Sequence, residues 1–241
     1  MSEIRNEERA AEFERWWRLR GVWVEEANQR RGGESGVMRL PPAEPDGPPL
    51  YLKRQTGHLC RSAAHPFGRP TILRELEAYQ AFARLGIHTP KVIYGAARQS
   101  ENGWEALLVT EALQGFAPLE EWFARNHDAA EKAEMWRRLA ETLARLHSAG
   151  WQHGCCYPKH IFVRLETESP PRIEIALLDL EKSRRRLLAF RASAHDLGQL
   201  ARHRGAIPPE ELVFFQDAYR RAREQYAARK KSLRAKDRKL L

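Results

Sequence analysis

The sequence predicts an α+β protein, with a β-rich first half and a helical second half. Short apolar segments separated by glycine and proline turns lie in residues 21–54 and 91–110. Apolar stripes at helical spacing dominate residues 118–149, and helical sequence returns after residue 189. Strands and helices that are segregated along a chain form α+β folds, so we expect a sheet lobe followed by a helical lobe. Clefts between such lobes are common ligand sites.

The composition is that of a folded globular protein. Of 241 residues, 42% are hydrophobic and 30% are charged, which excludes disordered and collagen-like chains. No apolar run approaches the roughly 20 residues of a membrane span, and Met1–Arg20 lacks the apolar core of a signal peptide. Three cysteines (Cys60, Cys155 and Cys156) cannot form a full disulfide framework. We therefore expect a cytoplasmic protein in a reducing compartment.

The first half is expected to supply the sheet and two helices. The expected strands are residues 21–25, 37–40, 50–54, 91–96 and 106–110, and the expected helices are residues 4–19 and 71–85. Five prolines between Pro41 and Pro49 predict a loop. Pro70 precedes the second helix and Gly86 ends it.

The second half is expected to be mainly helical. Helices are expected at residues 118–126, at residues 129–149 and from residue 189 onward, with one break at Pro208-Pro209. The middle helix has an apolar stripe of Met135, Trp136, Leu139, Leu143, Leu146 and His147. A loop at residues 153–160 and strands at residues 161–163 and 173–180 lie between these helices.

Five features in a fixed order carry the chemistry. They are a glycine-rich turn (Gly32, Gly33 and Gly36), a strand lysine (Lys53), the helical segment Arg74-Glu75-Leu76-Glu77, the loop His153–His160, and Asp179 after an apolar strand. Each feature is common by itself. Their order and spacing together are much rarer and indicate one function.

With these residues the chain resembles the protein-kinase-like fold. More narrowly it resembles the bacterial lipopolysaccharide core kinases, which include heptose kinases, Kdo kinases and InaA-type proteins. The resemblance runs from about Trp23 to Ala201, and its most specific stretches include Leu85-Gly-Ile-His-Thr-Pro90 and Tyr157-x-x-His160. It implies a bilobal fold, with a small β-rich N-terminal lobe (residues 1–111) and a larger helical C-terminal lobe (residues 112–241).

The resemblance also implies ATP and Mg²⁺ as cofactors. The implied nucleotide-binding residues are Gly32, Gly33, Gly36, Lys53, Glu75, Glu111 and Leu113, and the implied metal ligands are Asp179 and His160. ATP brings about four negative charges, so a lysine must neutralise its phosphates and a carboxylate must hold that lysine. Lys53 and Glu75 are assigned these roles, with Glu77 as the alternative carboxylate. Mg²⁺ prefers oxygen ligands, which Asp179 offers.

The resemblance breaks in the loop of residues 153–160, which we term the catalytic loop. The family places an aspartate two residues after the histidine, where it orients the acceptor hydroxyl and takes its proton. This chain has Cys155 in His153-Gly154-Cys155. A thiol of pKa about 8.5 stays mainly protonated at neutral pH unless a cation such as Lys159 or His160 lowers its pKa.

The expected catalytic residues are therefore Cys155, Lys159 and His153. The substitution leaves an active kinase and a nucleotide-binding pseudokinase both open. Asp196 resembles the aspartate that braces the catalytic loop in kinases, and a helix N-cap is its alternative role.

A zinc site is not expected from the sequence. Histidines and cysteines cluster between residues 147 and 160, at His147, His153, Cys155, Cys156 and His160. Their spacing lacks the paired arms of structural zinc sites. The ordinary alternatives are a buried His147 and a His153 that supports the loop backbone.

The net charge of +9 is concentrated near the C-terminus. Residues 220–241 hold ten basic and two acidic side chains, a net charge of +8. The resemblance implies an inner-core sugar of lipopolysaccharide as acceptor, carried on lipid A at the inner face of the inner membrane. A basic tail would attract that surface and an acidic acceptor. Nucleic acid is a less expected partner, because the tryptophans mostly fall on helical stripes.

Overall fold

The structure is a computed structural model that describes residues 2–30, 33–62, 64–101, 103–166 and 172–237. Antiparallel strands and separate helices confirm the α+β class. The chain forms two compact units, residues 1–79 with 90–114 and residues 80–89 with 115–241. This division differs from a single cut after residue 111, because residues 80–89 group with the second unit and residues 112–114 with the first. The bilobal arrangement itself stays a prediction.

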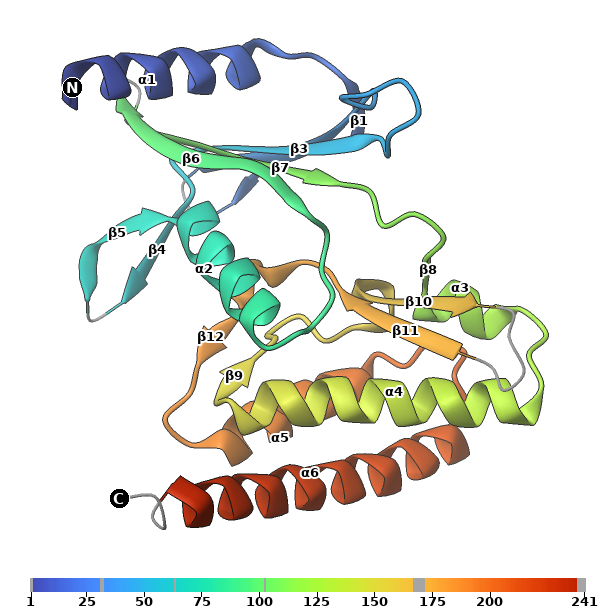
Figure 1. Cartoon of the computed structure of the whole chain (residues 1–241). Coiled ribbons are helices and arrows are strands. Elements are labelled where there is room, and N and C mark those ends of the chain that lie inside the picture. The colour runs from blue at the N-terminus through green and yellow to red at the C-terminus, as the bar shows by residue number, and fades with distance from the viewer. Residues whose placement is uncertain (1, 31–32, 63, 102, 167–171, 238–241) are drawn as a thin grey trace. The chain divides into compact units, whose positions relative to one another are not determined.

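Along the described chain three groups of strands (β1–β5, β6–β8 and β9–β12) are separated and flanked by helices (Figure 1). The helices are α1 (Ser2–Arg18), α2 (Thr71–Arg84), α3 (Leu119–Ala124), α4 (Ala129–Ser148), α5 (Ala189–Arg202) and α6 (Pro209–Asp237), with short 3-10 helices η1 (Pro158–His160) and η2 (Leu180–Lys182). The longer strands are β1 (Val22–Arg30), β2 (Gly33–Leu40), β3 (Leu50–Thr56), β6 (Val92–Ser100), β7 (Gly103–Glu111), β10 (Ile161–Glu166) and β11 (Arg172–Leu177). The hairpin strands β4 (Leu59–Ser62) and β5 (His65–Pro70) and the two-residue strands β8 (Ala117–Pro118), β9 (Trp151–Gln152) and β12 (Arg184–Arg185) complete the set described.

The first unit is built on a five-stranded antiparallel sheet of order β1-β2-β3-β7-β6. Helix α1 covers one face of this sheet (Figure 1). Its Phe13 and Trp16 pack into a core with Met38, Leu52 and Val109. The charged residues described in α1 are exposed except Glu14, which pairs with Arg98 of β6 over 2.7 Å. Burial of the aromatic side chains and this ion pair fix α1 to the sheet.

The first turns of α2 lie on the opposite face of this sheet (Figure 1). Side chains alternate between faces along a strand, so Leu52 faces α1 while its neighbour Lys53 faces α2. Gly95 of β6 allows the close approach, because a Cβ there would lie 2.6 Å from Leu76. Sheet alternation therefore sets the direction of Lys53.

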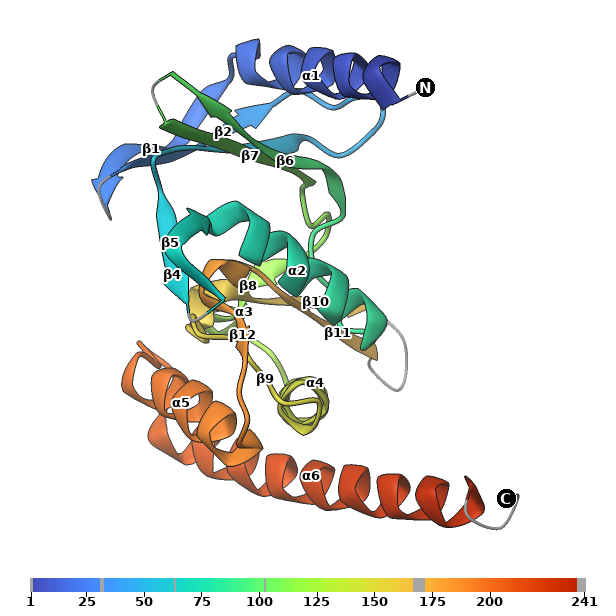
Figure 2. The same ribbon diagram turned by 90° about the vertical axis from the view of Figure 1, so that its left-hand side faces the viewer.

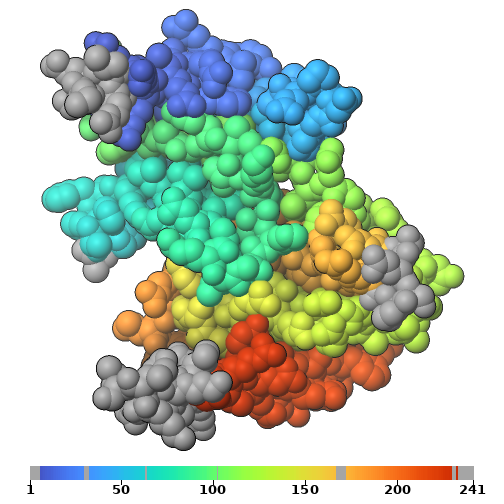
Figure 3. Space-filling view, viewed as in Figure 1, coloured from blue at the N-terminus to red at the C-terminus, as the bar shows by residue number. Residues whose placement is uncertain are grey.

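The second unit is built around α4. The predicted apolar stripe of α4 is confirmed, because all six of its residues from Met135 to His147 are buried. Helix α6 packs against α4, which is seen nearly end-on above α6 in Figure 2, and their surfaces adjoin in the space-filling view (Figures 1, 2 and 3). The contacting side of α6 is made by Leu212, Phe215, Tyr219 and Ala222, which are buried. None of the helices described is both long and apolar enough to cross a membrane.

Short strands hold the loops of the second unit. Strand β9 pairs with β12, and β10 pairs with β11 and β8. The Leu177 N–H donates to the carbonyl of His88, and the Leu178 N–H donates to that of His160, each over 2.9 Å. The end of β11 is thereby tied to His88, which follows α2, and to His160 of η1.

The predicted helices and longer strands are confirmed in place, with ends shifted by a few residues. The hairpin of β4 and β5 and the two-residue strands were not predicted, because such short pairings depend on their partners rather than on local pattern. Gly86 ends α2 in the left-handed conformation (φ 64°), as predicted.

Candidate active site

Lys53 and Glu75 form a largely buried ion pair in the first unit. Lys53 Nζ donates to Glu75 Oε2 over 2.9 Å, and the two side chains are 15% and 4% exposed. Glu77 instead accepts two hydrogen bonds from Arg69, at 2.6 and 2.7 Å. Two residues along a helix turn a side chain by about 200°, which separates the two carboxylates. The choice of Glu75 over Glu77 as the partner of Lys53 is confirmed.

The glycines of the predicted turn have a structural role in the sheet. A Cβ at Gly33 would lie 2.3–2.5 Å from the backbone of residues 56–58, and one at Gly36 would lie 2.7 Å from the Trp23 ring. Both glycines therefore allow chains to approach closely. The placement of Gly33 and Gly36 in a turn is wrong, because β2 begins at Gly33 and continues past Gly36. Gly32 lies outside the described residues.

The segment that ends β7 contains the predicted adenine-binding residues, Glu111 and Leu113. The carboxylate of Glu111 accepts from Lys91 Nζ over 2.8 Å, and its N–H donates to the Lys91 carbonyl over 2.9 Å. The Ala112 N–H donates to the Pro49 carbonyl over 2.9 Å. These bonds fix the segment as far as Ala112, and Leu113 is the next residue along it.

Asp196 of α5 braces the catalytic loop. Its carboxylate accepts from the N–H of His153 over 2.6 Å and from that of Gly154 over 3.0 Å, and it lies 3.1 Å from His147 Nε2. Burial raises the pKa of Asp196, but hydrogen bonding and the nearby histidines outweigh burial and leave the pKa below its ordinary value. The brace is confirmed. The N-cap alternative is wrong, because α5 begins at Ala189.

Gln199 is a second brace that sequence reasoning missed. Its Oε1 accepts from the Cys156 N–H over 3.0 Å, and its Nε2 donates to the Gly154 carbonyl and the Tyr157 hydroxyl, each over 3.1 Å. Gln199 follows Asp196 by three residues, so both side chains lie on one face of α5. That spacing, together with the role expected of Asp196, is the signal that could have identified it.

His153 is buried within the loop it helps to shape. Its Nδ1 accepts from the Cys155 N–H over 3.1 Å, and its carbonyl accepts from Ser183 Oγ over 2.7 Å. Burial lowers the pKa of His153, so the ring stays neutral. Gly154 adopts φ 85°, where a Cβ would lie 2.5 Å from the Lys182 carbonyl. His153 therefore positions the loop, and Gly154 lets the loop turn tightly.

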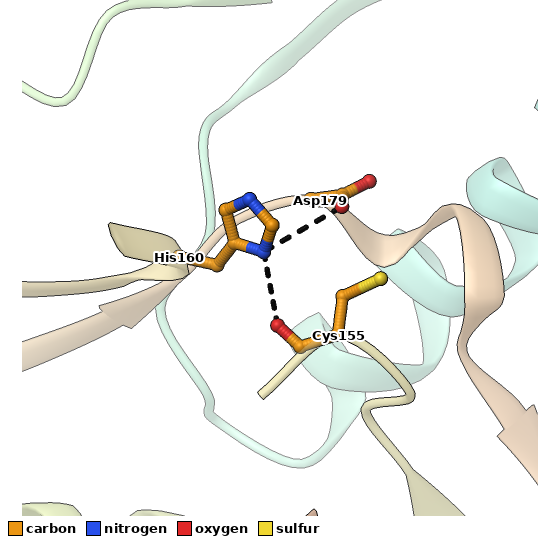
Figure 4. A group of neighbouring side chains, drawn as sticks. All are labelled: Cys155, His160 and Asp179. Atoms are coloured by element: carbon orange, nitrogen blue, oxygen red, sulfur yellow. Dashed lines mark hydrogen bonds and ion pairs between the residues drawn. The ribbon is translucent and has the colours of Figure 1, made fainter. Parts of the chain in front are cut away.

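Three predicted site residues meet in the second unit: Cys155, His160 and Asp179. One potential ligand atom from each lies within 4.8 Å of the other two. His160 Nδ1 donates to the Cys155 carbonyl over 3.0 Å and lies 3.5 Å from Asp179 Oδ2. The imidazole and the thiol both face the Asp179 carboxylate (Figure 4). Lys159, on η1 beside them, is exposed.

Asp179 occupies a sharp turn between β11 and η2. Its backbone has φ 59° and ψ 64°, the left-handed conformation that aspartate tolerates better than most residues. Among the non-glycine residues described, it alone has positive φ. Such strain is common at functional sites, and here it turns the carboxylate toward Cys155 and His160.

Cys155 carries its proton at neutral pH. Burial, and after it the neighbouring Asp179 carboxylate, raise the pKa of the thiol to about 12. The raised pKa agrees with the expected protonated thiol, and the alternative in which Lys159 or His160 lowers this pKa is wrong. A protonated thiol cannot accept a proton from an acceptor hydroxyl, so Cys155 does not replace the general base of the family.

Comparison with known proteins agrees with these motifs. The model of the lipopolysaccharide kinase (Kdo/WaaP) family matches residues 14–219, a range that includes Lys53, the catalytic loop and Asp179. Protein InaA of Escherichia coli (strain K12) is 42% identical over 201 residues, which cover 82% of this chain and 90% of InaA. With most of its length matched in both comparisons, the chain belongs to the lipopolysaccharide kinase (Kdo/WaaP) family.

Proposed function

We propose that the protein transfers the γ-phosphoryl group of MgATP to a hydroxyl of a lipopolysaccharide inner-core sugar, heptose or Kdo. Membership of a kinase family supports a phosphotransferase. The observation that carries the proposal is the ion pair of Lys53 and Glu75. A lysine held in place by a buried carboxylate supplies the fixed positive charge that the ATP phosphates require.

In this proposal the first unit binds the nucleotide. Lys53 contacts the α and β phosphates, and Glu75 keeps the lysine extended. Backbone groups of Glu111 and Leu113 hydrogen-bond to adenine. The amides of Glu111 and Ala112 donate to the carbonyls of Lys91 and Pro49, and the Leu113 amide is the next one along the chain. The hairpin between β1 and β2, with Gly33 at the start of β2, covers the phosphates.

Asp179 is the proposed main ligand of Mg²⁺, and His160 is the proposed second ligand. A carboxylate oxygen suits Mg²⁺, while a ring nitrogen is a weaker donor for it. When bound, Mg²⁺ neutralises charge on the phosphate oxygens during transfer. The left-handed turn at Asp179 fixes where this carboxylate lies.

The acceptor would meet the catalytic loop. Cys155 presents a neutral S–H group, His153 holds the loop in shape, and exposed Lys159 offers a positive charge to a phosphorylated acceptor. Without a general base, transfer depends on positioning and on electrostatic stabilisation, which supply much of the rate in phosphoryl transfer. A slow kinase is the expected result.

A nucleotide-binding pseudokinase is the second candidate function. The raised pKa of Cys155 favours it, because the proton-accepting aspartate of the family is replaced by a group that stays protonated. The Cys155→Asp variant separates the two functions. Activity that appears only in this variant supports the pseudokinase, and activity already present in the wild-type protein supports the kinase.

The test of the kinase is phosphoryl transfer from ATP labelled in the γ phosphate to purified lipopolysaccharide core. We expect Lys53→Ala and Asp179→Asn to lower the rate by about 100-fold or more, as loss of electrostatic groups at active sites does. Glu75→Gln should also lower the rate of phosphoryl transfer, because it removes the charge that holds Lys53. Glu77→Gln is the matched control, because Glu77 pairs with Arg69, and it should keep the wild-type rate. Wild-type rates in Lys53→Ala and Asp179→Asn would refute the mechanism.

We also propose that the protein docks on the anionic inner face of the inner membrane through the end of α6. Residues 229–241 hold seven Lys or Arg and one Asp, a net charge of +6. Among the described residues of α6 the last buried one is Ala222, and the Tyr226 hydroxyl still accepts from Arg145 Nε of α4 over 2.7 Å. The charge of residues 229–241 therefore follows the part of the helix seen to pack on α4. Exposed Leu187, Leu188 and Phe190, beside Arg185 and Arg191, offer a second basic and apolar surface.

Vesicle cosedimentation tests the docking. The full chain should bind vesicles rich in phosphatidylglycerol and release them at high salt, while a chain ending at Ala228 should bind more weakly. Each basic residue near an anionic surface contributes about 1 kcal/mol. Neutral phosphatidylcholine vesicles are the control. Equal binding of the full and shortened chains to anionic vesicles would exclude the tail as the docking element.

A further inference from the structure

We propose that Cys155, His160 and Asp179 form a binding site for a thiophilic divalent cation of the Zn²⁺ class, with Cys155 as a ligand. The three side chains offer one sulfur, one nitrogen and one oxygen donor. Zn²⁺ binds all three donor types, whereas Mg²⁺ takes oxygen almost exclusively. Replacement of the family's aspartate by Cys155 therefore changes which ion this cluster suits.

The distances fit such an ion after a small contraction. The potential ligand atoms lie within 4.8 Å of one another. Tetrahedral Zn²⁺ with bonds of about 2.0–2.3 Å holds its ligand atoms about 3.3–3.8 Å apart. A closure of about 1 Å through side-chain rotation is enough, with no change in the backbone.

The backbone around each ligand is already fixed. Asp196 and Gln199 hold the amides on both sides of Cys155. The carbonyl of His160 accepts from the Leu178 N–H, and Asp179 occupies its left-handed turn directly after Leu178. A preorganised set of ligands binds an ion more tightly than one that must be ordered on binding.

The ring nitrogen of His160 that faces the other two ligands is Nδ1, which lies 3.5 Å from Asp179 Oδ2, while Nε2 points away from them (Figure 4). The ion would therefore bind Nδ1, with the ring proton moved to Nε2. The ring would then exchange its hydrogen bond to the Cys155 carbonyl for the bond to the ion. Ion binding at this cluster thus requires a change of tautomer at His160.

Access to the cluster is one-sided. The side chains of His160 and Asp179 are 15% and 33% exposed, whereas Cys155 is buried beneath them. An ion entering from the exposed side would bind the thiolate, and the S–H proton would pass to solvent. Three protein ligands leave a fourth position for water or a phosphate oxygen, as in open zinc sites.

The sequence argued against zinc because the spacing of the histidines and cysteines in residues 147–160 lacks the paired arms of structural zinc sites. The third ligand, Asp179, comes from the far end of β11 and is brought in by the fold. Zn²⁺ and Mg²⁺ would compete for the Asp179 carboxylate, so a thiophilic ion would occupy the place of the catalytic metal. Binding itself does not require that the protein transfers phosphate, and it is measured without ATP.

Cobalt titration of the metal-free full-length protein tests the site. Co²⁺ replaces Zn²⁺ in such sites, and a thiolate ligand gives it a charge-transfer absorption in the near ultraviolet. We expect this band in the wild-type protein, its loss on addition of Zn²⁺, and its absence in Cys155→Ser. The matched control is Cys156→Ser, which removes a buried thiol outside the cluster and should keep the band.

A second variant guards against loss of folding in Cys155→Ser. Asp179→Asn keeps the thiol and should weaken Co²⁺ binding by about 10- to 100-fold, a range that even outer contacts of metal ligands reach. A folded wild-type protein without the band would overturn the proposal. So would a band of equal strength in Cys155→Ser, or wild-type affinity for Co²⁺ in Asp179→Asn.

Discussion

Asp196 fixes the backbone of the catalytic loop through its two carboxylate oxygens. One oxygen accepts from the His153 N–H and the other from the Gly154 N–H, and neither amide is accessible to water. Buried amides that lose their acceptor cost about 1–3 kcal/mol each. The shape of the loop thus depends on a residue more than forty positions away.

We expect Asp196→Ala to destabilise the protein by about 3 kcal/mol or more, since it leaves two buried N–H groups without an acceptor. The matched control is Asp217→Ala, which removes a half-exposed carboxylate paired with Arg220 and should cost less than about 0.5 kcal/mol. Denaturant unfolding followed by circular dichroism measures both. Equal effects of the two substitutions would contradict the brace.

The same carboxylate has a defined pH dependence. Its pKa is lower in the folded protein than in the unfolded chain, so its contribution to stability is complete above the unfolded pKa of about 3.9. That contribution is lost as the pH falls through the folded pKa. The difference in stability between wild type and Asp196→Ala should therefore narrow only in acid, and narrowing near neutral pH would refute this assignment.

Cys155 should be unreactive in the folded protein without bound metal. With a pKa of about 12, roughly one thiol in ten thousand is ionised at pH 8, and burial also blocks access. In the presence of a chelator, iodoacetamide should modify the partly exposed Cys60 first and Cys155 only after unfolding. Mass spectrometry of the modified peptides reports the order. Modification of Cys155 as fast as Cys60 would show that its thiol is neither buried nor protonated.

At the scale of the residue, the sequence predicted which side chains pair better than it predicted their pKa values. Glu75 could be chosen because Arg74-Glu75 is part of the kinase resemblance, and helix geometry places Glu77 on a different face. The pKa of Cys155 could not be predicted, because it depends on burial and on Asp179, which the fold brings from 24 residues downstream. Gln199 was missed for the same reason, since its partners are backbone groups of a distant loop.

At the scale of the element, α6 is held to α4 by one apolar side and several polar contacts. Trp136 Nε1 donates to Glu211 Oε2 over 2.6 Å, and the Tyr219 hydroxyl lies 2.8 Å from His147 Nδ1. Because His147 also contacts Asp196, a chain of three side chains joins α6 through α4 to α5. Helix α6 therefore supports the brace of the catalytic loop as well as carrying the basic tail.

Two adjacent phenylalanines of α6 differ in burial and therefore test how this helix packs. Phe215 is buried against α4, and we expect Phe215→Ala to cost about 3–5 kcal/mol through the cavity that it leaves. Phe214 is 67% exposed, so Phe214→Ala should stay within about 0.5 kcal/mol. Thermal unfolding compares them. Similar shifts for both would mean that α6 does not pack as described.

Elements with a long internal pattern were predictable, and those with a short one were not. The stripe of α4 and the glycine stop of α2 are local signals, so both were found in the sequence. Gly36 was assigned to a turn because three glycines within five residues resemble one. In the structure Gly36 lets β2 pass Trp23 and Ala27 closely, a tertiary requirement that leaves no local pattern.

At the scale of the whole molecule, the sequence predicted the family better than the boundaries of the two units. The order of Lys53, Glu75, the catalytic loop and Asp179 led to the lipopolysaccharide kinase family, in which the chain is now placed. The division into units was less predictable, because α2 crosses it and residues 80–89 group with the second unit. Because the boundary between Tyr79 and Gln80 falls inside α2, no change of composition marks it in the sequence.

The central claim is that the protein binds MgATP through Lys53, Glu75 and Asp179, and calorimetric titration with ATP tests it most directly. We expect binding to the wild-type protein that strengthens with Mg²⁺, and a loss of about tenfold or more, or about 1.4 kcal/mol, in Lys53→Ala. The measurement needs no acceptor and does not depend on Cys155. A folded wild-type protein that binds no ATP, or that binds it equally well without Mg²⁺ and without Lys53, would contradict the account.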